Sequence, residues 1–325
     1  MKKLLPALWA VLISLSILSG CEKEPTERFQ TSYTDVFDTV CTFTAYCDSE
    51  EQFKSVSESL HEELLRLHRL FDIYYGPSEG GIMALNRDGY LENPDEDITA
   101  LLELGKEYYG LSGGKLNIAM GAVLSLWHDS REDGVLPDKD RLAQASMHMD
   151  ISKLVIEDSK ITLSDPEMCI DVGSIAKGYS AQKAAEFIQD LGIKNFALDL
   201  GGNIKTSGTK PDGDWNIGVR DPDGGILTGI RASDLSVVTS GDYERFFELD
   251  GVRYSHIISP DTLYPADMYR SVTVICENSA DGDALSTSLF CMDFESGKAL
   301  CEKLEIRAIW IMPDGSTKSV GDIEI

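Results

Sequence analysis

Two stretches of the chain repeat apolar residues with helical spacing. The first runs from Leu60 to Phe71 and the second from Ile98 to Tyr109. In both, apolar positions recur after three or four residues, which places them on one helix face. Asn93-Pro94 lies between the two stretches and is typical of a turn. We therefore expect two amphipathic helices packed on a core.

From about Ser152 the pattern changes to short strands. Residues 153–157 and 160–164 flank Asp158-Ser159 and predict a hairpin. A helix is expected from about Ser174 to Leu191, where Gly192 would end it. Further strands are expected over residues 196–200, 215–220 and 236–239.

Asp250-Gly251 is the strongest hairpin signal in the chain, because this dipeptide favours a tight two-residue turn. We expect its strands over residues 244–249 and 252–258. A strand over 271–276, helices over 280–292 and 296–302, and a strand over 306–312 complete the prediction. Antiparallel strands mixed with separate helices indicate an α+β fold.

The first residues have the organisation of an export signal. Lys2 and Lys3 precede an apolar run over residues 4–18, which is short for a membrane-spanning helix. Leu18-Ser19-Gly20-Cys21 resembles a bacterial lipobox, so we expect a lipid on Cys21 that anchors the protein at the extracytoplasmic face of the cell membrane. The alternative is an ordinary signal peptide with a chance cysteine. We divide the chain into a signal peptide (1–20), a polar tether (21–30) and one domain (31–325).

The net charge limits the macromolecular partners of the chain, and the cysteine pattern limits its disulfides and metal sites. The formal net charge is -26, which argues against nucleic acid or anionic lipid surfaces as partners. Six cysteines besides Cys21 would permit disulfides in an exported protein. Several lie in apolar strand-like segments and no CxxC pair occurs, so we favour buried free thiols over disulfides or a zinc site.

Residues 170–179 place small side chains at a predicted strand-to-helix junction. Such a junction lets backbone amides approach an anion, and the helix N-terminus favours phosphate. Gly201-Gly202 follows another strand and permits a second close approach. The spacing matches neither a P-loop nor a GxGxxG motif. Ordinary glycine turns are the alternative.

Asp283 and Thr287 are one helical turn apart in the predicted helix over 280–292 and point to the same side. A carboxylate and a hydroxyl so placed suit Mg2+ that also contacts substrate phosphate. The alternative is that Asp281 or Asp283 caps the helix.

His256 follows the Asp250-Gly251 hairpin and is one of five histidines. It is a candidate for proton transfer or for binding a phosphate oxygen. Asp242, in the segment Thr239-Ser240-Gly241-Asp242-Tyr243, is a second candidate base. The alternative for His256 is a structural role.

Taken in order, these segments resemble the ApbE family of FAD:protein FMN transferases. The resemblance covers nearly the whole mature chain and predicts an ApbE-like fold of largely antiparallel mixed sheets with packed helices. Its blocks are residues 69–74 with 85–86, 113–121 with 126–127, 171–179, 200–202, 239–243, 255–258 and 283–287.

The resemblance also implies site residues. Mg2+ would be held by the carbonyl of Ala176 and the side chains of Asp283 and Thr287. The flavin would lie near Phe37, Tyr74, Asn117, Lys177, Tyr179, His256 and Ile257. Asn117 departs from the family, which often has Asp there, and residues 259–265 lack a glycine usual before the second proline.

The reaction implied is attack by a Ser or Thr hydroxyl of an exported acceptor flavoprotein subunit on the FMN phosphorus of FAD, with release of AMP. Mg2+ would be the cofactor and FAD the substrate. His256 is the first candidate base and Asp242 the second. Two alternatives remain: an FAD pyrophosphatase giving FMN and AMP, and a non-catalytic FAD-binding lipoprotein.

Overall fold

The structure is a computed structural model that describes residues 27–77 and 79–323. The predicted signal peptide and the lipidation site at Cys21 lie outside the described residues. Among the described residues, none of the helices is both long and apolar enough to span a bilayer.

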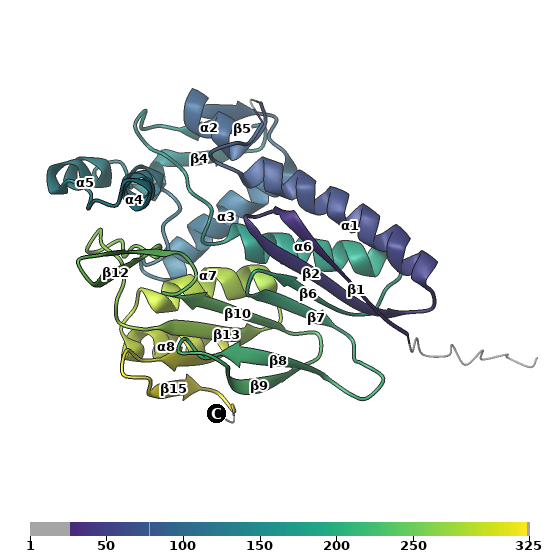
Figure 1. Cartoon of the computed structure of the whole chain (residues 1–325). Coiled ribbons are helices and arrows are strands. Elements are labelled where there is room, and N and C mark those ends of the chain that lie inside the picture. The colour runs from purple at the N-terminus through teal and green to yellow at the C-terminus, as the bar shows by residue number, and fades with distance from the viewer. Residues whose placement is uncertain (1–26, 78, 324–325) are drawn as a thin grey trace, which may run out of the picture.

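An antiparallel sheet forms the centre of the described part of the chain (Figure 1). Every pair of neighbouring strands runs in opposite directions. In order across the sheet the strands are β1 (Glu27–Val36), β2 (Thr39–Cys47), β6 (Asn195–Leu200), β7 (Asn203–Ser207), β10 (Ser236–Gly241), β13 (Ser271–Cys276), β14 (Arg307–Ile311) and β15 (Thr317–Val320).

Helices cover one face of this sheet. α1 (Glu50–Phe71) and α6 (Ala176–Asp190) bury apolar residues against β2 and β6. α3 (Glu96–Leu111), α7 (Ser279–Phe290) and α8 (Phe294–Leu304) share a larger core with β13 and β14. The hairpin of β8 (Trp215–Arg220) and β9 (Ile226–Ala232) packs on the opposite face. Both faces of the sheet are covered because successive side chains of a strand point to opposite faces. In β6, Phe196 and Leu198 face α1 and α6, while Ala197 faces the hairpin.

Smaller elements complete the described part of the chain. They are α2 (Ile82–Asp88), α4 (Gly121–Asp133), α5 (Lys139–Ser146), a 3-10 turn (Ile151–Lys153), β3 (Tyr90–Glu92), β4 (Leu154–Glu157), β5 (Lys160–Leu163), β11 (Phe246–Leu249) and β12 (Val252–Ser255). The hairpin β11–β12 packs its Phe247 and Tyr254 against Trp127 of α4.

The α+β prediction is confirmed, as are both hairpins and the two amphipathic helices. The bounds of most elements differ from the prediction by a few residues, and three of the differences affect the site or the limits of the domain. α6 begins at Ala176 rather than near Ser174, and β12 ends at Ser255, so His256 follows the strand. β1 begins at Glu27, four residues before the predicted start of the domain at residue 31, so residues 27–30 belong to the sheet and not to the tether. This edge strand is mostly exposed, so it lacks the alternating apolar pattern of a half-buried strand.

The six cysteines that the structure describes are free thiols, as the sequence predicts, but Cys169 and Cys276 are only partly buried.

Candidate active site

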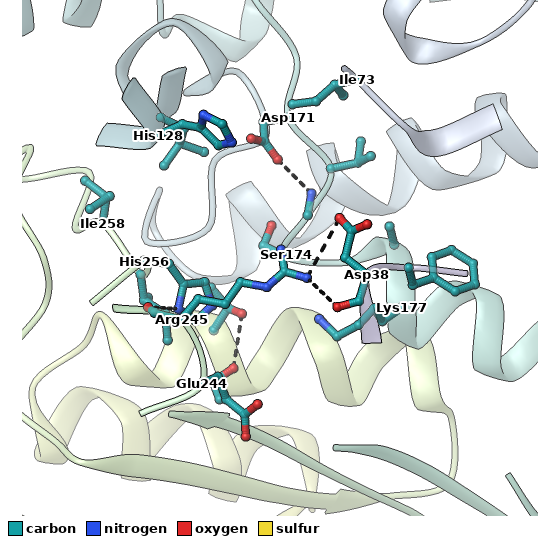
Figure 2. Close-up of a pocket in the computed structure, with 18 of the residues that line it drawn as sticks. Asp38, Ile73, His128, Asp171, Ser174, Lys177, Glu244, Arg245, His256 and Ile258 are labelled. Atoms are coloured by element: carbon teal, nitrogen blue, oxygen red, sulfur yellow. Dashed lines mark hydrogen bonds and ion pairs between the residues drawn. The ribbon is translucent and has the colours of Figure 1, made fainter. Parts of the chain in front are cut away.

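A cavity of about 760 Å³ opens beside the end of β10. Its wall is built by the turn between β1 and β2, the N-terminus of α6, the middle of α7 and the chain that leaves β12. Figure 2 shows Asp171, Lys177, Arg245 and His256, which come from separate segments, around this space. A volume of this size is within the usual range for a small-molecule site.

The floor of the cavity forms where α6 crosses α7. The backbone N–H of Gly178 donates to Asp283 Oδ2 at 2.7 Å. A Cβ at Gly178 would lie 2.3 Å from the Cβ of Asp283, so only glycine fits there. Asp283 is 4% exposed, and its burial raises the pKa of the carboxyl group, while the positive charge of Lys177 opposes that rise.

The N-cap of α7 explains why Asp283 is available to the cavity. Asn278 accepts hydrogen bonds from the backbone N–H groups of Ala280 and Asp281, so neither Asp281 nor Asp283 caps the helix. One turn after Asp283, Thr287 also lines the cavity, with its hydroxyl 3.3 Å from Ser240 Oγ.

Ala176 supplies a third oxygen near this floor. It lines the cavity, and its carbonyl accepts a hydrogen bond from Ser180 Oγ at 2.7 Å. This carbonyl also accepts the helical bond from the backbone N–H of Ser180, so a cation bound here would take the lone pair that Ser180 Oγ occupies. One carboxylate, one hydroxyl and one carbonyl form an oxygen donor set that fits a hard cation keeping water or phosphate ligands. No group of three or more His, Cys, Asp or Glu side chains suited to a metal occurs among residues 27–77 and 79–323.

His256 is held in a defined orientation at the cavity. Its backbone N–H and its ring Nδ1 both lie 3.0 Å from the carbonyl oxygen of Arg245. A carbonyl only accepts, so Nδ1 carries the hydrogen, and Nε2 of the neutral ring is left as an acceptor. Desolvation by the surrounding protein, with the nearby positive charge of Lys177, lowers the pKa of His256 to about 4, although part of the residue remains exposed to solvent. The ring is therefore neutral at pH 7.

The predicted flavin-binding residues Phe37, Tyr74, Asn117, Lys177 and Ile257 all line the cavity. Phe37 has φ 54°, and its N–H donates to His68 Nδ1 at 3.2 Å. Tyr74 is 46% exposed, and its ring lies 4.7 Å from that of His128.

Asn117 uses its side-chain amide within the protein. Its Nδ2 donates to the carbonyl of Met149 at 2.9 Å, and its Oδ1 accepts from the N–H of Ala119 at 3.0 Å.

Two predicted site residues lie outside this cavity. The hydroxyl of Tyr179 donates to Asp97 at 2.8 Å, in a network between α1, α3 and α6. Asp242 forms an ion pair with Arg270, with Oδ2 3.0 Å from Nε. The flavin contact stays a prediction for Tyr179, whose side chain does not line the cavity. Its position on α6 turns it toward α3 instead.

Charged residues that the prediction of site residues did not include also line the cavity. They are Arg131, Asp171 and Arg245 among others. Asp171 Oδ1 accepts from the N–H of Gly173 at 2.8 Å, and burial raises the pKa of its carboxyl group. Asp171 begins the segment 171–179, which resembles a family block, so the sequence contained a signal that could have identified it as a site residue. Arg131 lies on α4, where the apolar pattern predicted no helix.

Comparison with known proteins assigns the chain to a family. The sequence profile of the ApbE family matches residues 37–310. The chain belongs to the ApbE family. This ApbE chain is 35% identical over 252 residues to a FAD:protein FMN transferase of Treponema pallidum, covering 70% of this chain and 69% of the relative. It is 31% identical over 316 residues to that of Vibrio cholerae, covering 94% and 93%.

Solved structures agree with the fold of this ApbE chain. The flavin transferase ApbE from Vibrio cholerae has a TM-score of 0.80 at 26% identity, covering 91% of this chain and 97% of that chain. The ApbE protein from Thermotoga maritima has a TM-score of 0.81 at 25% identity, covering 90% and 96%. The predicted ApbE-like α+β fold is confirmed, and the chain is an enzyme of the transferase class.

Proposed function

We propose that this ApbE chain uses Mg2+ to cleave FAD and to transfer the FMN half to a Ser or Thr hydroxyl of an acceptor protein, with release of AMP. The observation that carries the proposal is the buried carboxylate of Asp283. It lies at the N-terminus of α6 and borders a cavity that Lys177 and His256 also line. FAD:protein FMN transferases among the relatives support flavin transfer as the reaction.

The donor set at the α6–α7 crossing supports Mg2+ as the cofactor. Asp283, Thr287 and the carbonyl of Ala176 would hold the ion beside the diphosphate of FAD. A cation there would favour the charged form of Asp283, which its burial opposes. Bound Mg2+ neutralises charge on the phosphoryl and leaving oxygens. Lys177 has no hydrogen-bond or ion-pair partner among the described residues and adds a positive charge for the same diphosphate.

The flavin ring would lie among Phe37, Tyr74 and Ile257, which all line the cavity. Aromatic and apolar side chains suit a flat ring system, since stacking adds about 1 kcal/mol beyond burial. Asn117 would border the ring through its backbone and Cβ, because its amide group is already hydrogen-bonded to Met149 and Ala119.

His256 is the proposed base. The oxygen of the acceptor hydroxyl forms a bond to the FMN phosphorus, and its proton passes to Nε2 of His256. Nε2 can accept this proton because the hydrogen of the neutral ring is on Nδ1, which donates to the Arg245 carbonyl. The bond from that phosphorus to the oxygen bridging to AMP breaks, and AMP leaves. Asp242 is less suited to this step because it is paired with Arg270 and lies outside the cavity.

Export and lipid anchoring complete the proposal. The signal-like residues 1–20 and Cys21 would place the enzyme at the extracytoplasmic face of the membrane, where its acceptor would be an exported flavoprotein subunit. Metabolic labelling with radioactive palmitate should label the wild-type protein in the membrane fraction. A Cys21→Ser variant that is labelled and membrane-bound like the wild type would contradict the anchor.

The activity is tested by incubating the full-length chain in detergent with FAD, Mg2+ and a candidate acceptor subunit from the same organism. Transfer predicts a fluorescent acceptor band on a denaturing gel and an equal amount of AMP. A control acceptor with its target Ser or Thr replaced by Ala should stay dark. Free FMN and AMP without labelled acceptor would indicate a pyrophosphatase, and unchanged FAD would indicate a binding protein, so either result overturns the proposal.

A further inference from the structure

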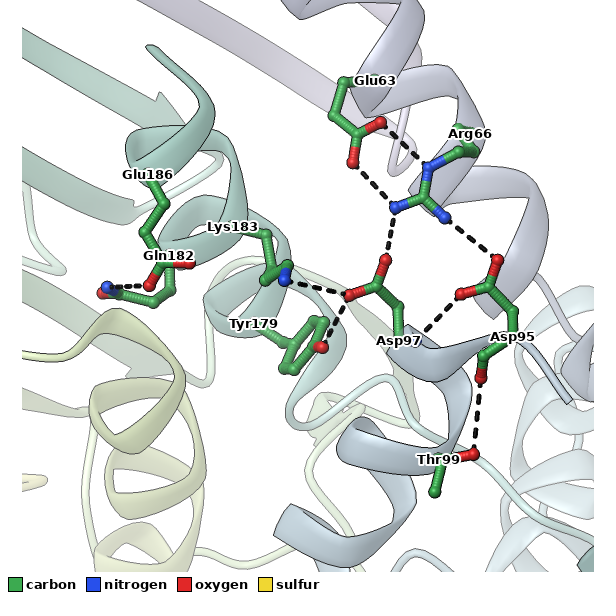
Figure 3. Close-up of polar contacts among 9 residues, drawn as sticks. All are labelled: Glu63, Arg66, Asp95, Asp97, Thr99, Tyr179, Gln182, Lys183 and Glu186. Atoms are coloured by element: carbon green, nitrogen blue, oxygen red, sulfur yellow. Dashed lines mark hydrogen bonds and ion pairs between the residues drawn. The ribbon is translucent and has the colours of Figure 1, made fainter. Parts of the chain in front are cut away.

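α3 contributes no residue to the wall of the cavity, yet its first turn holds a buried carboxylate, Asp97, with charged partners around it. Asp97 is 2% exposed and binds Arg66 of α1, the Tyr179 hydroxyl of α6 at 2.8 Å and Lys183 Nζ at 3.5 Å (Figure 3). Arg66 also binds Asp95, the N-cap of α3, at 3.3 Å. The start of α3 is therefore fixed to both α1 and α6.

The other end of α3 is fixed to α7. Tyr108, which is buried in the last turn of α3, packs in one core with Ala280 and Ala284 of α7 and lies beside the carboxylate of Asp281. Asp97 and Tyr108 are eleven residues apart, which is about 16 Å along a helix. One helix thus binds α6 at one end and α7 at the other.

Both attachment points lie close to the proposed metal ligands. Tyr179 is three residues after Ala176 in α6, and Asp281 is two residues before Asp283 in α7. The oxygen donors of a Mg2+ site must be placed accurately, because the ion requires near-octahedral geometry at about 2.0–2.1 Å. The relative position of α6 and α7 therefore decides whether Ala176 and Asp283 can share one ion.

A purely stabilising role explains the contacts of Asp97 poorly. The side chains of Arg66 and Lys183 are 40% and 37% exposed, so solvent screens their ion pairs with Asp97 and these pairs add little to stability. The hydrogen bond from the Tyr179 hydroxyl to Asp97 is directional, so it fixes the rotation of α6 relative to α3. An apolar residue in place of Asp97 would not provide this bond.

We propose that α3 is a two-ended strap that positions the metal site, with Tyr179 and Tyr108 as positioning residues that touch neither metal nor FAD. This rests on the proposed function, because it takes the α6–α7 crossing as the Mg2+ site. It also gives Tyr179 a role different from the flavin contact that the family resemblance implies.

The test uses Tyr179→Phe and Tyr108→Phe in the full-length chain, because each removes one hydroxyl and keeps the ring. Tyr33→Phe is the matched control: Tyr33 is also buried, and its hydroxyl donates to the Ser57 carbonyl at 2.7 Å, outside the cavity wall. The readout is binding of Mn2+, as a paramagnetic substitute for Mg2+, measured by electron paramagnetic resonance in the presence of FAD. Melting temperatures are measured alongside.

The strap predicts that each positioning variant weakens Mn2+ binding about tenfold, a size typical of residues that orient metal ligands. Because a strap fails when either end is released, the double variant should bind Mn2+ about as weakly as each single variant. Tyr33→Phe should lower the melting temperature and bind Mn2+ normally. Lower melting temperatures with wild-type Mn2+ binding in both positioning variants would overturn the strap, as would single effects that multiply in the double variant.

Failure of the strap is distinguishable from failure of the metal site. If Asp283→Asn abolishes Mn2+ binding while Tyr179→Phe and Tyr108→Phe bind like the wild type, only the strap is wrong. If Asp283→Asn binds Mn2+ and transfers FMN normally, the proposed metal site is wrong.

Discussion

The backbone N–H of Gly178 donates to the buried carboxylate of Asp283, and the two residues touch where α6 crosses α7. A methyl group at Gly178 would meet the Cβ of Asp283 at 2.3 Å and the carbonyl oxygen of Ser279 at 2.4 Å. The close crossing is what brings a carboxylate from α7 to the first turn of α6, so the glycine and the acid act as one unit.

Gly178→Ala is therefore expected to destabilise the protein by about 1–3 kcal/mol, the usual range for overpacking, and to reduce transfer. Without a clash, Ala in a helix would stabilise by roughly 1 kcal/mol relative to Gly. Gly110→Ala in α3 is the matched control, since a Cβ there meets no atom within 4 Å. Urea unfolding of both variants measures whether the free energy of unfolding falls or rises relative to the wild type. Equal stability of the two variants would contradict the packing argument.

Asp283→Asn should keep the fold and lose transfer. The amide oxygen can still accept from Gly178, and removing a carboxylate whose burial raises its pKa does not lower stability at pH 7. The loss of the charged group in the proposed metal site is expected to reduce FMN transfer by about 100-fold or more. Initial rates are measured over a range of Mg2+ concentrations, and full activity at high Mg2+ would count against the assignment.

Lys177→Met is expected to raise the KM for FAD about tenfold, because a cation is removed from a cavity that must hold a diphosphate. Lys298→Met on α8 is the control, since Lys298 lies on the surface in an ion pair with Glu302. Steady-state kinetics with FAD varied at fixed acceptor separate KM from kcat. An unchanged KM for FAD would show that Lys177 does not contact the substrate.

His256→Gln should lower kcat by about 100-fold or more, within the usual contribution of a general base. Glutamine keeps a polar side chain of similar size but offers no basic nitrogen to the acceptor hydroxyl. FAD binding, followed by flavin fluorescence, should change little. If the variant keeps the wild-type kcat, His256 is not the base and another residue must accept the proton.

The pH dependence follows from the lowered pKa of His256. A base must be unprotonated, so kcat/KM should be insensitive to this group from pH 8 to about 6 and fall as the pH approaches 4. Between its folded pKa of about 4 and the unfolded value of about 6.5, the unfolded chain binds more protons, so this group makes stability rise with pH. Urea midpoints at pH 5 and pH 7 should therefore differ less in His256→Gln than in the wild type.

Local pattern was enough to predict much of this enzyme. The spacing of apolar residues predicted α1 and α3, and Asp250-Gly251 predicted the hairpin β11–β12, because both signals act over a few neighbouring residues. The four-residue spacing of Asp283 and Thr287 placed both on one side of α7. Strands β1 and β2 were not predicted, since the mostly exposed β1 depends on pairing with β2.

What only the tertiary structure decided is which side chains meet. Tyr179 lies in the same segment as Lys177, but the rotation of α6 turns Lys177 to the cavity and Tyr179 to Asp97. Asp242 is paired by Arg270, 28 residues away along the chain. The sequence by itself determined the fold class, the family resemblance and the residue types of the site, because these depend on local order along the chain. The direction of each side chain was decided by packing between segments distant in sequence, which local spacing does not encode.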